Sequence, residues 1–312
     1  MRITILGAGA VGSVIGASLC DHHDVTLVAR PDHARKIASE GLRIAGTREL
    51  VAFPAVAEEL LPLMPGELLF VTVKAHALRE ALEPVADRIP ADTLVVLLQN
   101  GLGVEEIAEH VLPGRRLVRA VVGIGATFRE PGCVEHWDGP SLPQWGGPGL
   151  ELPASRDGHV VAEAFGPGWI RARCREDFES VVWRKLAVNC VVNPLSSILR
   201  VRNCDAITPE TAEIRRGVFE EVRAVAAAAD IVIEGAFLQS LEERIKASQN
   251  WNSMLQDLER GRPTEIDFLN GAVSERGRAQ EIPTPMNDTL TALVRALEGR
   301  PALGNVGPPV RT

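Results

Sequence analysis

The sequence predicts an α/β protein in which a doubly wound parallel sheet is followed by an all-helical domain. Three observations carry this prediction. Apolar runs alternate with helical patterns in the first half of the chain, a glycine-rich turn directly follows the first run, and helical periodicity replaces the strand pattern from Asp177 onward. Strands and helices in alternation are typical of a parallel sheet covered on both faces. The 312 residues suit two domains, which we place at residues 1–175 and 176–312.

The expected strands of the N-terminal domain are short and almost wholly apolar, as strands buried on both faces are. They are residues 2–6, 24–29, 68–73, 94–98 and 117–122. A helix is expected between the first two strands, over residues 10–20. Residues 133–168 contain many Gly and Pro and predict hairpins and loops, and residues 169–174 are expected to close the domain.

The second half of the chain predicts helices throughout. Apolar residues recur at helical spacing over 214–229, and residues 234–260 predict one or two long helices. Pro263 ends that pattern, and Thr264 is a good N-cap, so a new helix is expected to begin there. The tail after Arg300 is expected to be loose.

The composition excludes several classes of function. Lys and Arg number 33 against 41 Asp and Glu, which gives a net charge of −8, so no nucleic-acid partner is expected. No apolar run reaches the roughly 18 residues that a membrane helix needs, so no membrane partner is expected either. The five cysteines are scattered and odd in number, which indicates reduced thiols and a cytoplasmic location. Tyr is absent, which rules out a Tyr–Lys dehydrogenase, and the pair His22-His23 has no third ligand in sight, so no metal is expected.

The glycine-rich turn has the pattern G-x-G-x-x-G between a strand and a helix. In a Rossmann-type fold the first Gly allows the tight turn, the second lets a pyrophosphate approach the backbone, and the third lets helix and strand pack closely. The helix N-terminus supplies N–H groups and a partial positive charge. We therefore predict dinucleotide binding here, the alternative being a merely structural turn. The residues of this turn are Gly7, Ala8, Gly9, Ala10, Val11 and Gly12.

Three polar residues follow the next expected strands. Arg30 stands where NAD-binding proteins carry an acid for the ribose 2′-OH, and a guanidinium suits a 2′-phosphate, so we predict NADPH over NADH. A solvated surface Arg is the alternative. Lys74 lies at the carboxyl edge of the sheet as a second phosphate candidate, or as a plain strand-end Lys. Asn100 can bond a nicotinamide ribose or amide, although Asn-Gly is also an ordinary turn signal.

A group of polar residues on an expected helix predicts a substrate site. Lys185 and Asn189 are four residues apart and share one face, and Asn193 follows one turn later. They either face water, as Lys and Asn commonly do, or line a cleft between the domains. Glu265 is expected in the first turn of its helix. It is either an acid placed there for the helix dipole or a carboxylate that pairs with Lys185.

The chain resembles the ketopantoate reductase (2-dehydropantoate 2-reductase) family over nearly its whole length. The resemblance rests on G-A-G-A-V-G at the start, V-K-A at Lys74, Q-N-G at Asn100, W-x-K-L-x-x-N-x-x-x-N-P across residues 183–194, S-M-L-Q-D at Ser253 and T-E-I-D-x-L-N-G at Glu265. The last three motifs are specific in combination. The family's second domain is helical, as expected here.

The resemblance implies NADPH-dependent reduction of ketopantoate to pantoate in pantothenate and coenzyme A biosynthesis. It implies that Lys185 is the general acid, that Glu265 orients Lys185 and touches the cofactor, and that Arg30 and Lys74 flank the 2′-phosphate. Asn203 stands where a further substrate-contacting Asn would fall. The residues expected to contact the substrate are Asn100, Lys185, Asn189, Asn193, Asn203 and Ser253.

Two departures concern the substrate more than the reaction. Residues 132–168 form a long, Trp-bearing stretch, and Arg200 and Arg202 could reshape the acyl pocket. The alternatives are a paralogue that reduces a different 2-oxo acid and a non-catalytic regulator that responds to NADPH. The helical domain could supply the surface of a homodimer, although it shows no clean heptad seam.

Overall fold

The structure is a computed structural model that describes residues 1–137, 149–166, 168–247, 249–298 and 300. The chain divides into two compact units. Met1–Gln99 and Val104–Val181 form the first, and Asn100–Gly103 and Val182–Thr312 form the second. The expected boundary after residue 175 precedes this division, which falls inside a long helix. The short segment Asn100–Gly103 belongs to the second unit although the strand before it belongs to the first.

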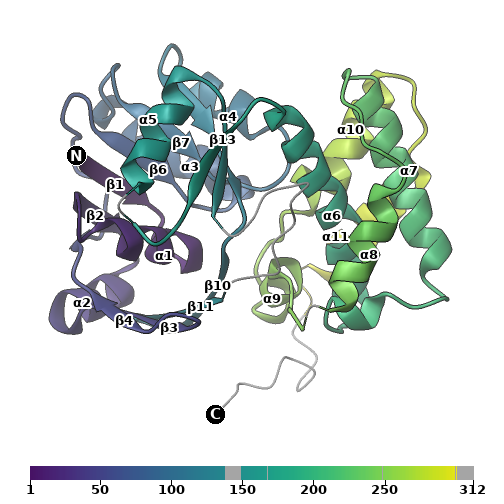
Figure 1. The fold of residues 1–312 in the computed structure, drawn as a ribbon, viewed down its shortest axis with the longest axis horizontal. Coiled ribbons are helices and arrows are strands. Elements are labelled where there is room, and N and C mark those ends of the chain that lie inside the picture. Colours follow the sequence, from purple (N-terminus) through teal and green to yellow (C-terminus); the bar gives the residue numbers. More distant parts are fainter. Residues whose placement is uncertain (138–148, 167, 248, 299, 301–312) are drawn as a thin grey trace. The chain divides into compact units, whose positions relative to one another are not determined.

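A six-stranded parallel sheet forms the centre of the first unit, in the order β5-β2-β1-β6-β7-β8 (Figure 1). The strands are β1 (Arg2–Leu6), β2 (Asp24–Val28), β5 (Ala55–Ala57), β6 (Leu68–Val71), β7 (Leu94–Leu97) and β8 (Arg116–Arg119). Every residue of β6 and β7 is buried. The predicted doubly wound sheet is therefore confirmed, and the apolar runs are its central strands.

Helices cover this sheet. They are α1 (Ala10–Leu19), α2 (Pro31–Glu40), α3 (Leu78–Leu82), α4 (Val104–Val111) and α5 (Arg156–Phe165), with 3₁₀ turns at Ala75–Ala77 and Glu83–Arg88. Phe165 of α5 meets Phe70 of β6 edge to face, with ring centroids 5.8 Å apart. Gly16 of α1 packs so closely that a Cβ there would lie 2.5 Å from the Leu27 side chain. The core of the unit thus lies between the sheet and these helices.

Two smaller sheets complete the first unit. One has the order β10-β11-β3-β4 and the other β13-β12-β9. Their strands are β3 (Leu42–Gly46), β4 (Leu50–Ala52), β9 (Val121–Val122), β10 (Gly125–Glu130), β11 (Cys133–Trp137), β12 (Leu150–Pro153) and β13 (Ala172–Arg175). The single strand expected at 117–122 is split into β8 and β9 by Ala120, whose N–H bonds to the Leu97 carbonyl at 2.8 Å.

The prediction of only hairpins and loops over 133–168 is wrong for α5. Ser155 caps this helix by accepting a hydrogen bond from the Gly158 N–H at 3.1 Å, and Val161, Ala164 and Phe165 are buried on one face. The high Gly and Pro content comes mainly from residues 139–149, which hid the amphipathic pattern that follows. Residues 138–148 lie outside the described residues.

Among the described residues of the second unit, all regular elements are helices, as predicted (Figure 1, green to yellow). Its helices are α6 (Phe178–Leu199, which begins in the first unit), α7 (Ala212–Ala227), α8 (Phe237–Lys246), α9 (Ser253–Glu259), α10 (Asn270–Ala279) and α11 (Pro285–Leu297). Short 3₁₀ turns lie at Cys204–Ala206 and Ile266–Phe268. The segment 234–260 contains two helices, α8 and α9, and the tail expected to be loose lies almost wholly outside the described residues.

The prediction that a helix begins at Thr264 is wrong. A 3₁₀ turn, Ile266–Phe268, comes first, and α10 begins only at Asn270. The Thr264 hydroxyl accepts from the Ile266 N–H at 3.2 Å and donates to the Glu298 carboxylate at 2.6 Å. Thr264 therefore ties this turn to the end of α11 and does not cap a new α-helix.

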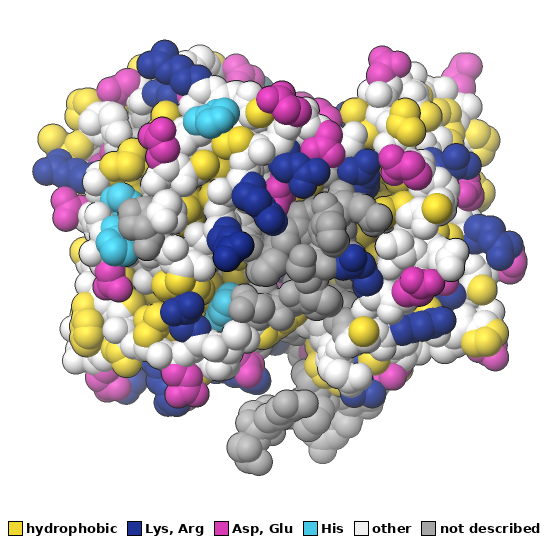
Figure 2. Space-filling model, in the orientation of Figure 1, with side chains coloured by type: hydrophobic (Ala, Val, Ile, Leu, Met, Phe, Trp, Pro, Cys, Tyr) yellow, Lys and Arg dark blue, Asp and Glu magenta, His cyan; other side chains and the backbone are white. Residues whose placement is uncertain are grey.

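The described residues form a surface of mixed charge, and their helices are short or polar. On the face shown in Figure 2, Lys and Arg side chains are interspersed with Asp and Glu side chains. Among the described residues, the helices are all too short or too polar to cross a lipid bilayer.

Candidate active site

The glycines of the turn between β1 and α1 have two different roles. Some are required by the fold itself, and one leaves space for a ligand. Gly7 has a φ of 96°, and a Cβ there would lie 2.6 Å from the Val73 side chain. A Cβ on Gly12 would lie 2.5 Å from the Thr72 hydroxyl oxygen. Both glycines are thus required by the fold itself, as the tight turn and the close packing of helix on strand predict.

Gly9 is different, because the protein around it leaves room for a side chain. Among the described residues outside its own helix and its chain neighbours, a Cβ there would come within 4 Å only of the Gly7 carbonyl oxygen, at 3.9 Å. Gly9 is also the N-cap of α1, and the first turn of α1 contains no acid. The open space over a helix N-terminus fits a group that must approach the backbone and carry negative charge, such as a pyrophosphate.

Arg30 lies at the start of α2, directly after the end of β2. It is the exposed N-cap residue of α2, and Pro31 follows it at the first helical position, where a missing N–H costs nothing. Ala29, between β2 and Arg30, is buried and carries no charge. Where NAD-binding proteins carry an acid for the ribose 2′-OH, this chain carries the guanidinium of Arg30.

A buried histidine, which the sequence analysis did not single out, fixes the place of α2. His33 accepts a hydrogen bond at Nδ1 from the Gly132 N–H, at 2.8 Å. The proton of the neutral ring is therefore assigned to Nε2, which lies 3.0 Å from the Ser13 hydroxyl oxygen on α1. Burial lowers the pKa of His33, which favours the neutral ring. His33 thus joins α2, and with it Arg30, to the helix that follows the glycine turn.

Lys74 lies near the carboxyl end of β6, where ligands of parallel α/β sheets bind. It is half-buried and precedes the 3₁₀ turn Ala75–Ala77. The side chain of Gln99 donates to the carbonyls of Val71 and Val73, at 2.8 and 3.0 Å, and holds the chain before Lys74 beside the end of β7. The structure thus places Lys74 at the predicted edge of the sheet.

The motifs Q-N-G and T-E-I-D meet in the second unit, although 165 residues separate their key side chains. The Asn100 side-chain amide donates to a Glu265 carboxylate oxygen at 3.3 Å. Next to it, the Leu102 N–H donates to the Phe268 carbonyl at 2.9 Å. Gly101 has a φ of 92°, and a Cβ there would lie 2.2 Å from that carbonyl oxygen, so only glycine fits. The structure therefore brings together two of the predicted site residues, and Glu265 is buried.

Lys185, Asn189 and Asn193 lie along α6 as predicted. Asn189 and Asn193 are both buried, so the alternative that they simply face water is wrong. Lys185 is half-buried, and burial lowers its pKa from 10.5 to about 8. Desolvation penalises the charged amine. A pKa nearer neutrality suits a group that must hold and then release a proton at neutral pH.

Asn203 takes part in a polar network between α6 and α9. Its side-chain oxygen accepts from the Ser196 hydroxyl at 3.2 Å and from the Asn252 amide at 3.0 Å. Asn252, the first residue of the polar run 252–257, is the buried N-cap of α9 and accepts from the Leu255 N–H. It was not predicted as a site residue, although it directly precedes S-M-L-Q-D. Ser253, the first residue of α9, is exposed.

The two arginines expected to reshape the acyl pocket are both paired with acids. Arg200 lies 2.9 Å from the Glu259 carboxylate, and Arg202 lies 2.8 Å from that of Asp205. Their charges are therefore largely compensated within the second unit.

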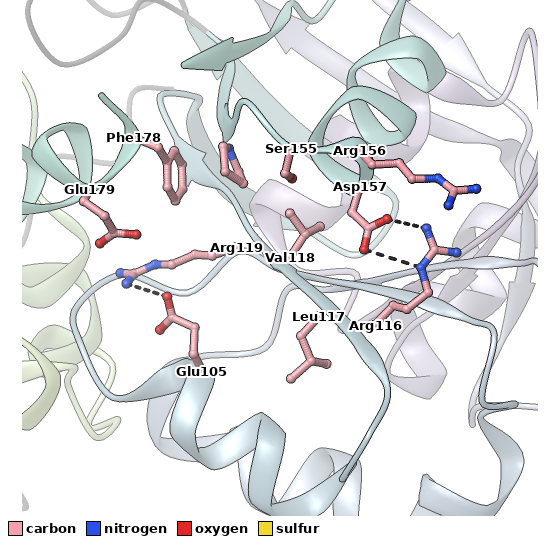
Figure 3. A pocket seen from close by; sticks show the side chains of 11 residues that line it. Glu105, Arg116, Leu117, Val118, Arg119, Ser155, Arg156, Asp157, Phe178 and Glu179 are labelled. Atoms are coloured by element: carbon pink, nitrogen blue, oxygen red, sulfur yellow. Dashed lines mark hydrogen bonds and ion pairs between the residues drawn. The ribbon is translucent and has the colours of Figure 1, made fainter. Parts of the chain in front are cut away.

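A pocket of about 550 Å³ in the first unit contains none of the predicted site residues (Figure 3). Arg119 pairs there with Glu105 at 2.9 Å, and Arg116 pairs with Asp157. Because its acids and bases are matched, we assign it no ligand. Among the residues that the structure describes, no three His, Cys, Asp or Glu side chains are grouped so that they could hold a metal ion.

The fold and the glycine turn define the class of dinucleotide-binding α/β proteins, since a parallel sheet that begins with G-x-G-x-x-G is the mark of that class. The family model "Ketopantoate reductase PanE/ApbA" matches residues 3–143, and the model of its C-terminal part matches residues 177–298. The chain belongs to the ketopantoate reductase PanE/ApbA family.

Curated relatives and solved structures that resemble this protein match nearly the whole chain. The 2-dehydropantoate 2-reductase of Pyrococcus horikoshii is 34% identical over 96% of this chain and 98% of its own length. That of Archaeoglobus fulgidus is 33% identical over 95% and 98%. A ketopantoate reductase from Ralstonia eutropha has a TM-score of 0.85 at 28% identity over 96% of this chain and 98% of its own. D-mandelate dehydrogenase with NADH and anilino(oxo)acetate has a TM-score of 0.84 at 27% identity over the same shares.

Proposed function

We propose that this protein reduces 2-dehydropantoate (ketopantoate) to pantoate with NADPH, in pantothenate and coenzyme A biosynthesis. The observation that carries the proposal is the arrangement on α6, where Lys185 shares the helix with the buried Asn189 and Asn193. Burial lowers the pKa of Lys185 to about 8, which is consistent with this arrangement. The relatives at 33–34% identity, named 2-dehydropantoate 2-reductases, support the choice of substrate.

The proposed cofactor site consists of the glycine turn and two basic side chains. The N–H groups at the start of α1 hold the pyrophosphate over Gly9, and Arg30 and Lys74 flank the 2′-phosphate. Asn100 and Glu265 contact the nicotinamide end. The space over Gly9 and the presence of Arg30, not an acid, directly after Ala29 support this assignment. When bound, NADPH supplies the hydride that reaches the carbonyl carbon.

Residues of the second unit stabilise the carbonyl oxygen of the substrate and supply the proton that it takes up. Negative charge grows on the carbonyl oxygen as the carbon is reduced, and the ammonium of Lys185 stabilises that charge and donates its proton to it. The buried carboxylate of Glu265 orients the amine. The hydroxyl and carboxylate of the substrate are held by Asn100, Asn189, Asn193, Asn203 and Ser253.

A second candidate is the reduction of another 2-oxo acid at the same site. The likeness to D-mandelate dehydrogenase, with a TM-score of 0.84 over 96% of the chain, favours it. The chemistry at the carbonyl would be unchanged, and only the pocket for the side chain would differ. A regulator that binds NADPH without catalysis is disfavoured, because a sensor has no use for a proton donor with a lowered pKa. The homodimer stays a prediction.

We expect wild-type protein to oxidise NADPH with ketopantoate at least about 10-fold more efficiently than NADH, because a charge-assisted contact contributes about 1.5–3 kcal/mol. Arg30→Ala should lose most of that preference while keeping its activity with NADH. Steady-state absorbance assays with both nucleotides measure the preference for NADPH. The 2-oxo acid that corresponds to mandelate is assayed as a second substrate. Equal efficiency with NADH would contradict the cofactor assignment, and no turnover of either oxo acid would contradict the function.

A further inference from the structure

Pro194 leaves a gap in the hydrogen bonding of α6. It lies inside this helix, five residues before its end at Leu199. Proline has no N–H, so the carbonyl of Cys190, four residues earlier, loses its partner within the helix. Cys190 is fully buried, so water does not reach that carbonyl easily. The affected carbonyl lies between Asn189 and Asn193, two residues of the proposed substrate site.

Asn270, at the start of α10, fills this gap. Its side-chain nitrogen donates to the Cys190 carbonyl oxygen at 3.1 Å, across 80 residues of sequence. Asn270 is itself fully buried. The side chain therefore replaces the backbone N–H that Pro194 removes.

A chain of hydrogen bonds through Asn287 to the half-buried Glu221 sets the orientation of this amide. The same nitrogen of Asn270 donates to the side-chain oxygen of Asn287 at 2.9 Å. The nitrogen of Asn287 in turn donates to Glu221 at 2.7 Å, and the backbone N–H of Asn287 donates to the same carboxylate oxygen at 2.9 Å. Since an ionised carboxylate only accepts, each amide must present its nitrogen in one direction. Both N–H groups of Asn270 are thereby used, one on α11 and one on α6.

We propose that Asn270 is a positioning residue, which acts through the Cys190 carbonyl to hold Asn189 and Asn193 in register with Lys185. The inference rests on the proposed function of those three residues. Glu265 and Asn270 lie five residues apart in T-E-I-D-x-L-N-G. One motif thus supplies a carboxylate to the proposed site and an amide that bonds to α6, the helix that carries Lys185, Asn189 and Asn193.

The test is a double-mutant cycle of Asn270→Ala and Pro194→Ala. Asn270→Ala should lower kcat/KM for the oxo acid about 10²-fold, because a displacement of about 1 Å can cost that much, and NADPH affinity should stay unchanged. In the Pro194→Ala background the new backbone N–H can bond the Cys190 carbonyl, so Asn270→Ala should cost less than about 10-fold there. Ser274→Ala is the matched control. It removes a buried hydroxyl on α10 that has no hydrogen-bond partner among the described residues, and it should leave the rates unchanged.

Equal losses in the two backgrounds would overturn the proposal, and so would wild-type kinetics of Asn270→Ala. If Asn270→Ala alone does not fold, the comparison of Pro194→Ala with the double variant still decides, since a second large loss there contradicts the inference. If the wild type turns over no oxo acid, the proposed function fails instead. The same four proteins then test the Asn270 bond through their unfolding free energies, where the same non-additivity is expected and additive losses would overturn it.

Discussion

Lys185→Ala is expected to lower kcat with ketopantoate by about 10²-fold or more and to leave NADPH affinity intact. The ammonium stabilises charge that appears only as the carbonyl is reduced, so its loss raises the barrier of the chemical step. The cofactor contacts proposed in the first unit are untouched. Stopped-flow NADPH oxidation gives the rate, and fluorescence titration gives the dissociation constant of NADPH.

Two further variants separate proton donation from charge. Lys185→Arg keeps a positive charge but has a pKa too high to release the proton easily, so we expect it to spare KM for the oxo acid more than kcat. Lys246→Ala removes an ammonium from an exposed position on α8 and should behave as wild type. Near-normal turnover by Lys185→Ala would remove Lys185 from the role of proton donor.

Gly9→Ala is expected to weaken NADPH binding about 10²-fold without a comparable loss of stability. The described part of the protein leaves room for a Cβ on Gly9, which would lie 3.9 Å from the Gly7 carbonyl oxygen. The methyl group would instead occupy the space proposed for the pyrophosphate. Two lost charge-assisted hydrogen bonds of about 1.5–3 kcal/mol each are enough for an effect of this size.

Other glycines supply matched controls for that measurement. Gly12→Ala should lower the unfolding free energy, because its Cβ would lie 2.5 Å from the Thr72 hydroxyl oxygen. Gly235→Ala, whose Cβ would have none of the described atoms within 4 Å beyond its chain neighbours, should change neither stability nor binding. Calorimetric titration with NADPH and thermal unfolding distinguish the three variants. A folded Gly9→Ala protein with wild-type affinity would show that the pyrophosphate does not lie over this turn.

The central strands and the cofactor turn were predictable because their signals are local. Strands β6 and β7 are buried on both faces, which forces every residue to be apolar. Each glycine of G-x-G-x-x-G meets a local requirement of the single turn between strand and helix. The short strands β3, β4 and β5 carry no such signal, since each is partly exposed. Helix α5 was missed because Gly and Pro in the residues before it masked its one apolar face.

The polar contacts of the site depend on residues far apart in the chain. Asn189 and Asn193 could have faced water or the interior, because helical spacing fixes only that they share a side. The bond between Asn100 and Glu265 and the bond from Asn270 to Cys190 join residues 165 and 80 positions apart. His33 was overlooked for the same reason, since its partner Gly132 is 99 residues away. The pairing of Lys185 with Glu265 stays a prediction.

The pH dependence of kcat/KM for the oxo acid, at saturating NADPH, tests the role of Lys185 most directly. The amine must be protonated to donate, and burial lowers its pKa from 10.5 to about 8. Activity should therefore be level below about pH 8 and fall about tenfold per pH unit above it, and the residual activity of Lys185→Ala should lack this break. A wild-type profile that stays level to about pH 10, as for a lysine of ordinary pKa, would contradict proton donation by a desolvated Lys185.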